Sequence, residues 1–254
     1  EDSVCIPGGF TLLGDEKLRG TADGFLMPFD PVPLRPVRVR PFFMDVAEIS
    51  VGRFRALLDE SPGLISGLPE QWEPTGSQAS CTWLGPDNAD NDALPLSCVN
   101  GKTASEVCAA LGGGLPTEAE WEHAARGRGR RWRYPWGNEW PECCTAIAGG
   151  QACGRNAPEP AGNSSNALGC ATRDVSRDGV LDLAGNLQEI SSDRLVSYAE
   201  GCWNRAGVML DPSCTEPEHA PLVVRGGVYN EPATFGAAPV RRLFTGAYGV
   251  GAVG

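Results

Sequence analysis

The chain has 254 residues, of which 41% are hydrophobic, and a net charge of −11. This length suits one large domain that buries a core, and the composition excludes a disordered chain. The acidic charge argues against a nucleic-acid partner, since binding a phosphate backbone needs a basic face, and no apolar run approaches the roughly 18 residues of a membrane span.

The first hundred residues predict two strands, one helix and a loop. We expect strands at Ile6–Leu13 and Pro36–Val46, the second because its apolar residues alternate with period two. Ser50 is predicted to cap a helix that ends near Glu60. Residues 61–100 are turn-rich and acidic, which is typical of a surface loop. The apolar face of the helix would be formed by Val51, Phe54, Leu57 and Leu58.

Two Thr-x-x-Glu sequences predict further helix starts. Thr103–Glu106 and Thr117–Glu120 both match the capping box, in which the Thr hydroxyl accepts from the N3 amide and the Glu accepts from the N-cap amide. Glu118 would lie in the first turn, where the helix dipole favours a carboxylate. Glu122 and His123 have no role in a helix start, and we expect His123 to be structural or at the surface rather than a catalytic base.

The rest of the chain is less regular. Arg126–Gly137, with five arginines and two tryptophans, allows an RNA-binding interpretation, which the acidic remainder disfavours. The aromatic residues of the overlapping stretch Arg130–Trp140 would either pack in the core or form a binding face. Residues 139–177 are irregular, and late strands are predicted at Leu222–Tyr229 and Pro239–Phe244.

Ten cysteines and two histidines make disulfides a better prediction than zinc sites, because no Cys-x-x-Cys motif is present. We expect up to five disulfides, formed in an oxidising compartment: extracellular, periplasmic or at the cell surface. Adjacent Cys143 and Cys144 must have different partners. The N-terminus lacks the pattern of a signal peptide, so any secretion signal would already have been removed. The excess of arginine over lysine fits a GC-rich, bacterial source.

Several segments together resemble the formylglycine-generating enzyme family, also called sulfatase-modifying factors. They are IPGGFTLLG, FFMDVAEISVGRFRALL, LPTEAEWE, AGNLQE and VVRGGVYN, in matching order along nearly the whole chain. The resemblance implies one α+β domain over residues 1–254, distantly related to C-type lectins. It would have few helices, short strands, little regular structure and several disulfides.

The sequence also departs from the family pattern. Gly114 stands where the family usually has arginine, and Gly185–Ile190 lacks both tryptophans of the usual GNVWEW. The family's closing Gly-Phe-Arg strand would begin at Gly254, where the sequence stops, so we expect that strand to be missing. A cysteine after this strand often pairs with the one at Cys108, which would then be a thiol or pair elsewhere.

The resemblance also indicates which chemistry is lost. The enzymes oxidise a substrate cysteine to formylglycine with oxygen and Cu(I), which two cysteines shortly after the Arg-Gly-Gly hold as thiolates. Residues 225–244 contain no cysteine and no histidine, so we expect no copper and no formylglycine-generating activity. Iron-dependent members need a histidine triad, and this chain has only His123 and His219. No haem or nucleotide is expected.

A calcium site of the family would survive. Its pattern maps onto the carboxylates of Asp182 and Glu189 and the carbonyls of Gly185 and Leu187, hard oxygen ligands that suit Ca²⁺. A metal-free capped turn is the alternative. A second family site would map near Asn156 and Asn166.

The preferred function is therefore a non-catalytic, calcium-stabilised, secreted or cell-surface protein that binds a protein or peptide or belongs to an extracellular assembly. One alternative is an enzyme, an oxidoreductase or maturation enzyme, with altered chemistry at the former copper position. Another is an inactive paralogue that still binds the peptide substrate. The candidate pocket for altered chemistry comprises Tyr229, Asn230, Glu231, Arg241 and Arg242.

Overall fold

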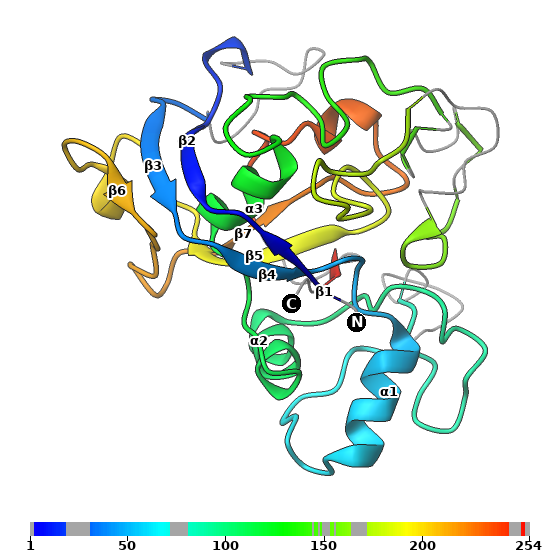
Figure 1. Cartoon of the computed structure of the whole chain (residues 1–254). Coiled ribbons are helices and arrows are strands. Elements are labelled where there is room, and N and C mark those ends of the chain that lie inside the picture. The colour runs from blue at the N-terminus through cyan, green and yellow to red at the C-terminus, as the bar shows by residue number, and fades with distance from the viewer. Residues whose placement is uncertain are drawn as a thin grey trace.

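The computed structural model describes residues 3–18, 31–71, 81–143, 145–146, 148, 153–154, 156–163, 172–243 and 250–251. In these residues the fold combines short strands with three helices, as the resemblance implied (Figure 1). One sheet joins β1 (Ser3–Ile6) and β4 (Phe42–Asp45). A second has the order β2 (Gly9–Leu13), β3 (Arg35–Val39), β6 (Met209–Leu210). The third has the order β8 (Arg242–Leu243), β7 (Leu222–Arg225), β5 (Gln188–Arg194), β9 (Val250–Gly251).

The strands predicted at Ile6–Leu13 and Pro36–Val46 are each interrupted by a break. The first breaks at Pro7 and Gly8 between β1 and β2, and the second breaks at Arg40 and Pro41 between β3 and β4. A proline cannot donate to a strand ladder. A Cβ at Gly8 would lie 2.5 Å from the carbonyl oxygen of Val39, so the two breaks pass each other closely. The late strands are shorter than predicted, and each is confined to β7 or β8.

Two of the three predicted helix starts are confirmed. Ser50 caps α1 (Val51–Glu60) by accepting from the amide of Arg53 at 3.1 Å. Thr117 caps α3 (Glu118–Ala125) in a complete capping box, with Glu120 accepting from the amide of Thr117 at 2.8 Å.

The start of α2 (Gly101–Ala110) was predicted wrongly. Asn100 is its N-cap and accepts from the amide of Thr103 at 2.9 Å, so the helix begins before the predicted capping box. The Thr103 hydroxyl instead donates to the carbonyl of Gly67 at 3.1 Å. Glu106 accepts from both the amide and the hydroxyl of Ser66, at 2.7 Å each. Tertiary contacts with the 66–67 segment thus take up the side chains that resembled a cap.

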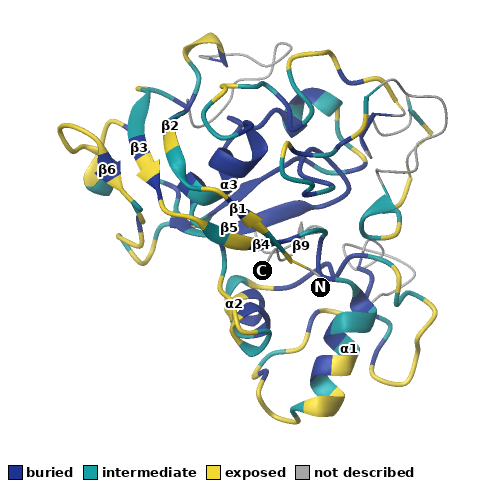
Figure 2. Ribbon diagram, in the orientation of Figure 1, coloured by how far each residue is buried: buried dark blue, intermediate teal, exposed yellow. Residues whose placement is uncertain are grey.

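Helix α3 lies in the middle of the molecule and is buried on almost all sides (Figure 2). It packs against β2, β3 and β5, with Ala119 facing one apolar cluster and Trp121 another. Helices α1 and α2 form a separate apolar cluster at the lower end of the view, around Phe54, Trp83 and Val107.

Three disulfides lie in the described residues: Cys81–Cys98, Cys143–Cys153 and Cys202–Cys214. Two further cysteines are thiols, Cys5 exposed and Cys108 buried, so five disulfides cannot form in this structure. Burial raises the pKa of the Cys108 thiol to about 12. Cys144 and Cys170 lie outside the described residues. Helices long and apolar enough to cross a membrane are absent from the part of the chain that the structure describes.

Candidate functional site

The turn between Asp182 and Glu189 forms a buried loop at the start of β5. Asp182 and Asn186 both have positive φ, of 61° and 57°, which turns the backbone sharply on itself. Asp182 Oδ2 accepts from the amide of Gly162 at 2.5 Å, which ties the turn to the preceding loop. Both predicted carboxylate ligands, Asp182 and Glu189, are 1% exposed.

Glu189 is the carboxylate on this turn whose buried charge is not compensated. Its two carboxylate oxygens are buried, and they have no hydrogen-bond partner among the other residues that the structure describes. Gly226 makes room for this side chain, because a Cβ there would lie 2.3 Å from Glu189 Oε2. Burial and the neighbouring Glu48 raise the pKa of Glu189 well above its usual range.

Two further buried carboxylates surround the turn, and sequence reasoning missed both. Glu48 accepts from the amide of Leu187 at 2.9 Å and from the Asn186 side chain at 2.6 Å. Asp174 Oδ2 accepts from the amide of Ala184 at 2.7 Å. Burial and the charge of Asp182 raise the pKa of Glu48 and of Asp174. The signal in the sequence was a carboxylate next to apolar residues, as in VAEIS.

A calcium site and a metal-free turn are the two interpretations of these residues. A buried carboxylate without partners is costly, and a cation with hard oxygen ligands would compensate it. Among the described residues no three His, Cys, Asp or Glu side chains are arranged to hold a metal together. The predicted site has two such side chains, Asp182 and Glu189, and its other predicted ligands are the carbonyl oxygens of Gly185 and Leu187.

The second predicted metal site is only partly described. Asn156 is exposed, on the loop before the turn. Asn166 lies outside the described residues.

The Arg-Gly-Gly sequence and the segment after it each contribute one arginine to a buried ion cluster. Arg225 and Arg241 both bind Glu118, at 2.6 Å each. Arg225 also reaches Glu122 at 3.1 Å, and Glu118 accepts from the hydroxyl of Tyr198 at 3.0 Å. All the charged side chains in these pairs are fully buried. Burial alone would raise the pKa of Glu118, but the two arginines hold it below its usual value.

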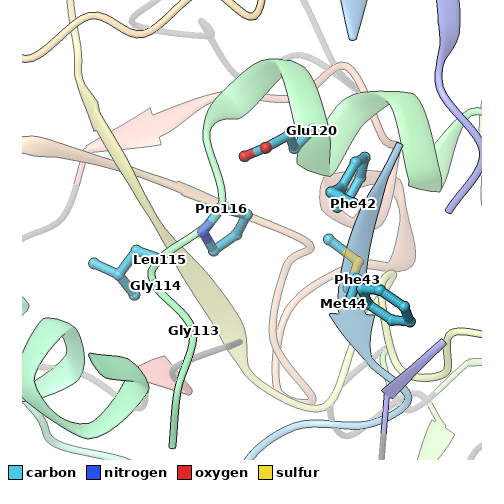
Figure 3. Close-up of a pocket in the computed structure, with 8 residues that line it drawn as sticks. All are labelled: Phe42, Phe43, Met44, Gly113, Gly114, Leu115, Pro116 and Glu120. Carbon is cyan, nitrogen blue, oxygen red and sulfur yellow. The ribbon is translucent and has the colours of Figure 1, made fainter. Parts of the chain in front are cut away.

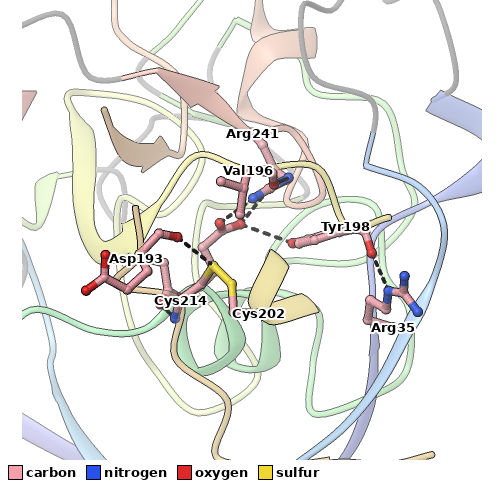
Figure 4. Close-up of a disulfide and its surroundings, with 9 residues drawn as sticks. Arg35, Asp193, Val196, Tyr198, Cys202, Cys214 and Arg241 are labelled. Atoms are coloured by element: carbon pink, nitrogen blue, oxygen red, sulfur yellow. Dashed lines mark hydrogen bonds and ion pairs between the residues drawn. A yellow bond between two sulfur atoms is a disulfide. The ribbon is translucent and has the colours of Figure 1, made fainter. Parts of the chain in front are cut away.

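This cluster is anchored to the loop that carries the Cys202–Cys214 disulfide (Figure 4). Arg241 donates to the carbonyl of Val196 at 2.9 Å and lies 3.9 Å from the centre of the Tyr198 ring. Asp193, on β5, accepts from the amide of Glu118 at 2.7 Å and from the amide of Cys214.

The five residues of the predicted pocket do not form one group. Arg241 belongs to the buried cluster, whereas Arg242 pairs with Glu231 near the surface. Tyr229 is buried beside Leu187, and burial raises its pKa. Asn230 is exposed. Sequence reasoning placed these residues near one another because they follow the same motif, but the chain turns several times between them.

The structure also places the residues of the 115–140 region. His123 is buried, and its Nε2 lies 3.1 Å from the carbonyl oxygen of Pro7, which is the structural role expected. Burial lowers its pKa. Of the aromatic residues, Tyr134 is fully buried and Trp140 is 58% exposed. Arg126, at the start of the basic stretch, is itself buried and pairs with Glu122 at 3.0 Å.

A small hollow opens beside α3, between β4 and the segment before the helix (Figure 3). It has a volume of about 260 Å³. Phe42, Phe43 and Met44 line one side, and Gly113–Pro116 with Glu120 line the other. A Cβ at Gly114 would meet nothing within 4 Å, so the glycine is not required by packing.

The short strands, the buried central helix and the disulfide-linked loops define an α+β domain of the formylglycine-generating-enzyme type. Residues 1–253 match the model of the sulfatase-modifying factor enzyme 1-like domain, and the chain belongs to this family.

Relatives in the family differ in activity. The chain is 30% identical over 165 residues to the formylglycine-generating enzyme of Streptomyces coelicolor, covering 54% of this chain and 50% of that one. It is equally 30% identical over 162 residues to the inactive C-alpha-formylglycine-generating enzyme 2 of Mus musculus, covering 53% and 50%. The matched region thus spans about half the length of these relatives. PvdO from Pseudomonas aeruginosa has the same fold, with a TM-score of 0.68 and 21% identity over 99% of this chain and 92% of PvdO.

Proposed function

We propose that this chain is a non-catalytic member of the family, a secreted or cell-surface protein that uses the scaffold for binding or assembly. The observation that carries the proposal is the composition of the segment after the Arg-Gly-Gly sequence. Residues 225–254 contain no cysteine and no histidine. A soft Cu(I) ion requires such ligands, and the resemblance places them in this segment.

The side chains that do occupy this segment support the same conclusion. Arg225 and Arg241 are committed to ion pairs with Glu118, and Arg242 is committed to Glu231. Burial raises the pKa of Tyr229 above its ordinary value of 10, which makes its phenol a still poorer base or nucleophile at neutral pH. An altered chemistry would need a nucleophile next to a base. The arginines of this segment are instead neutralised by carboxylates in ion pairs.

Similarity alone does not decide between an active and an inactive member, because both relatives are 30% identical to this chain. The disulfides support secretion or surface display, since they persist in oxidising compartments. The partner would be a protein or peptide, in view of the acidic charge of −11.

Titration with Cu(I) in the presence of a competing chelator tests this proposal. A Cys5→Ser variant is used so that the exposed thiol does not bind the metal. We expect no stoichiometric Cu(I) binding, with the formylglycine-generating enzyme of Streptomyces coelicolor titrated in parallel as the reference. Tight binding of one equivalent by the Cys5→Ser variant would overturn the proposal.

We further propose that Ca²⁺ stabilises the domain at the turn between Asp182 and Glu189. The support is the buried, partnerless carboxylate of Glu189 together with Asp182 on the same turn. The ion would supply positive charge that no described residue brings to Glu189, and its role would be structural. A metal-free turn with a protonated Glu189 is the competing interpretation.

A further inference from the structure

A cavity of about 530 Å³ lies at the opposite end of the β5–β7 ladder from the turn between Asp182 and Glu189, called the calcium turn after the proposal above. In the register of this ladder Glu189 pairs with Arg225 at one end, and Arg194 pairs with Leu222 at the other. The cavity therefore shares no residue with the calcium turn or the buried ion cluster. It lies between these strands and α2, and its lining includes Lys102, Ser105, Leu115, Ser192, Arg194 and Leu222.

The charge of this cavity is opposite to that of the chain. Lys102 and Arg194 both line it, and no Asp or Glu does, although the net charge is −11. Arg194 donates from Nη1 to the carbonyl of Ala220 at 3.1 Å, which holds the guanidinium in place. No ion pair joins Arg194 to a carboxylate in the described part of the chain. Lys102 is 74% exposed and forms a surface ion pair with Glu106, at 3.6 Å.

Apolar and hydroxyl groups complete the lining. Leu115 and Leu222 are half-buried, and Ser105 and Ser192 add hydroxyls. The apolar wall is fixed by close packing, because a Cβ at Gly101 would lie 2.4 Å from Leu222 Cδ1. The cavity thus combines an oriented guanidinium, an ammonium and an apolar surface, at a volume typical of small-ligand sites.

We propose that this cavity binds a carboxylate carried by an apolar group, as at the carboxyl terminus of a peptide that ends in an apolar residue. The planar fork of Arg194 matches the two oxygens of a carboxylate, and Lys102 adds charge without fixing geometry. Leu115 and Leu222 would take up the apolar group. The inference rests on the proposed binding role but not on the copper argument, so each can fail without the other.

Calorimetric titration of the full chain with N-acetyl-L-phenylalanine and with its amide tests the carboxylate. We expect saturable binding of the acid and none of the amide. Arg194→Gln should weaken binding about tenfold or more, because a charge-assisted hydrogen-bond pair is lost. The affinity of Arg194→Lys should lie between those of the wild type and Arg194→Gln, since lysine keeps the charge but lacks the paired donors of the guanidinium. Arg205→Gln is the matched control: Arg205 is exposed on another loop, and its loss removes the same charge.

Equal binding of acid and amide, or an equal loss in Arg205→Gln, would overturn the proposal, as would an unsaturated titration of the wild type at about 10 mM ligand. The melting temperature of each variant shows whether it is folded, and Arg194→Lys keeps the test valid if Arg194→Gln is not. A hexapeptide ending in a free phenylalanine separates the two sources of carboxylate. Tighter binding than N-acetyl-L-phenylalanine indicates a peptide terminus, and equal binding indicates a small acid.

Discussion

Glu118 stands at the first position of α3, where its sequence context predicts a carboxylate stabilised by the helix dipole. In the fold it is fully buried and neutralises Arg225 and Arg241, which are more than a hundred residues away in the chain. No local pattern in the sequence could reveal these partners, because each arginine belongs to a segment whose position is set by tertiary packing. The helix start was predictable, but the ion cluster was not.

We expect Glu118→Gln to destabilise the domain by about 3–5 kcal/mol, because it leaves two buried guanidinium groups with incomplete compensation. Chemical denaturation of the purified variant measures this loss. Asp211→Asn is the matched control: Asp211 pairs with Arg40, whose side chain is 77% exposed, and its loss should cost less than about 1 kcal/mol. Similar losses in the two variants would show that the buried cluster contributes no more than a surface pair.

Asp193 should make the folded state less stable as the pH rises. Burial and the charge of Glu118 raise its pKa from 3.8 to about 6. The folded state therefore holds the proton of Asp193 more tightly than the unfolded state does. The contribution of Asp193 to the free energy of unfolding is fully favourable below pH 3.8 and is lost as the pH rises to about 6. The loss amounts to about 3 kcal/mol.

Denaturation curves of wild type and Asp193→Asn between pH 4 and pH 7 (a range of about three units around the shifted pKa) isolate this contribution. The wild type should lose more stability across the range than the variant does. Parallel pH profiles would contradict the assignment. Other carboxylates titrate in both proteins, so the difference between the two slopes is the quantity that matters.

At the scale of elements, the sequence predicted which segments form helices better than where strands end. Ser50 and Thr117 cap their helices as expected, because the capping interaction is local. The Thr103 motif failed because Asn100, three residues earlier, offers an equally good cap, and segment 66–67 binds the side chains that the motif needs. Strand ends depended on partners that the local sequence does not specify.

The turn from Asp182 to Glu189 is the element on which the calcium proposal depends. We expect Ca²⁺ to raise the melting temperature over that in EGTA by about 5–10 °C at a hundredfold excess over the dissociation constant. Glu189→Gln should abolish this difference, because it removes a carboxylate ligand. Asp87→Asn, at an exposed acidic loop, should keep it. An unchanged melting temperature of the wild type in EGTA would rule out structural calcium.

At the scale of the whole molecule, the family pattern predicted the α+β fold, because its motifs mark the segments that build the central helix and the β5–β7 ladder. It also led to the two proposals on the turn between Asp182 and Glu189 and on the segment after the Arg-Gly-Gly sequence, since both lie close to those motifs in the sequence. It did not reveal the cationic cavity, which is assembled from α2, β5 and β7. A site made of separate elements has no linear signature.

The central claim is that this scaffold has lost formylglycine-generating chemistry. The most direct test is incubation of the full chain with Cu(I), oxygen, a reductant and a cysteine-containing sulfatase peptide, with the product measured by mass spectrometry. The Streptomyces coelicolor enzyme serves as the positive control. We expect no more conversion of the peptide cysteine than is seen without the protein. Several turnovers of aldehyde product per chain would contradict the claim.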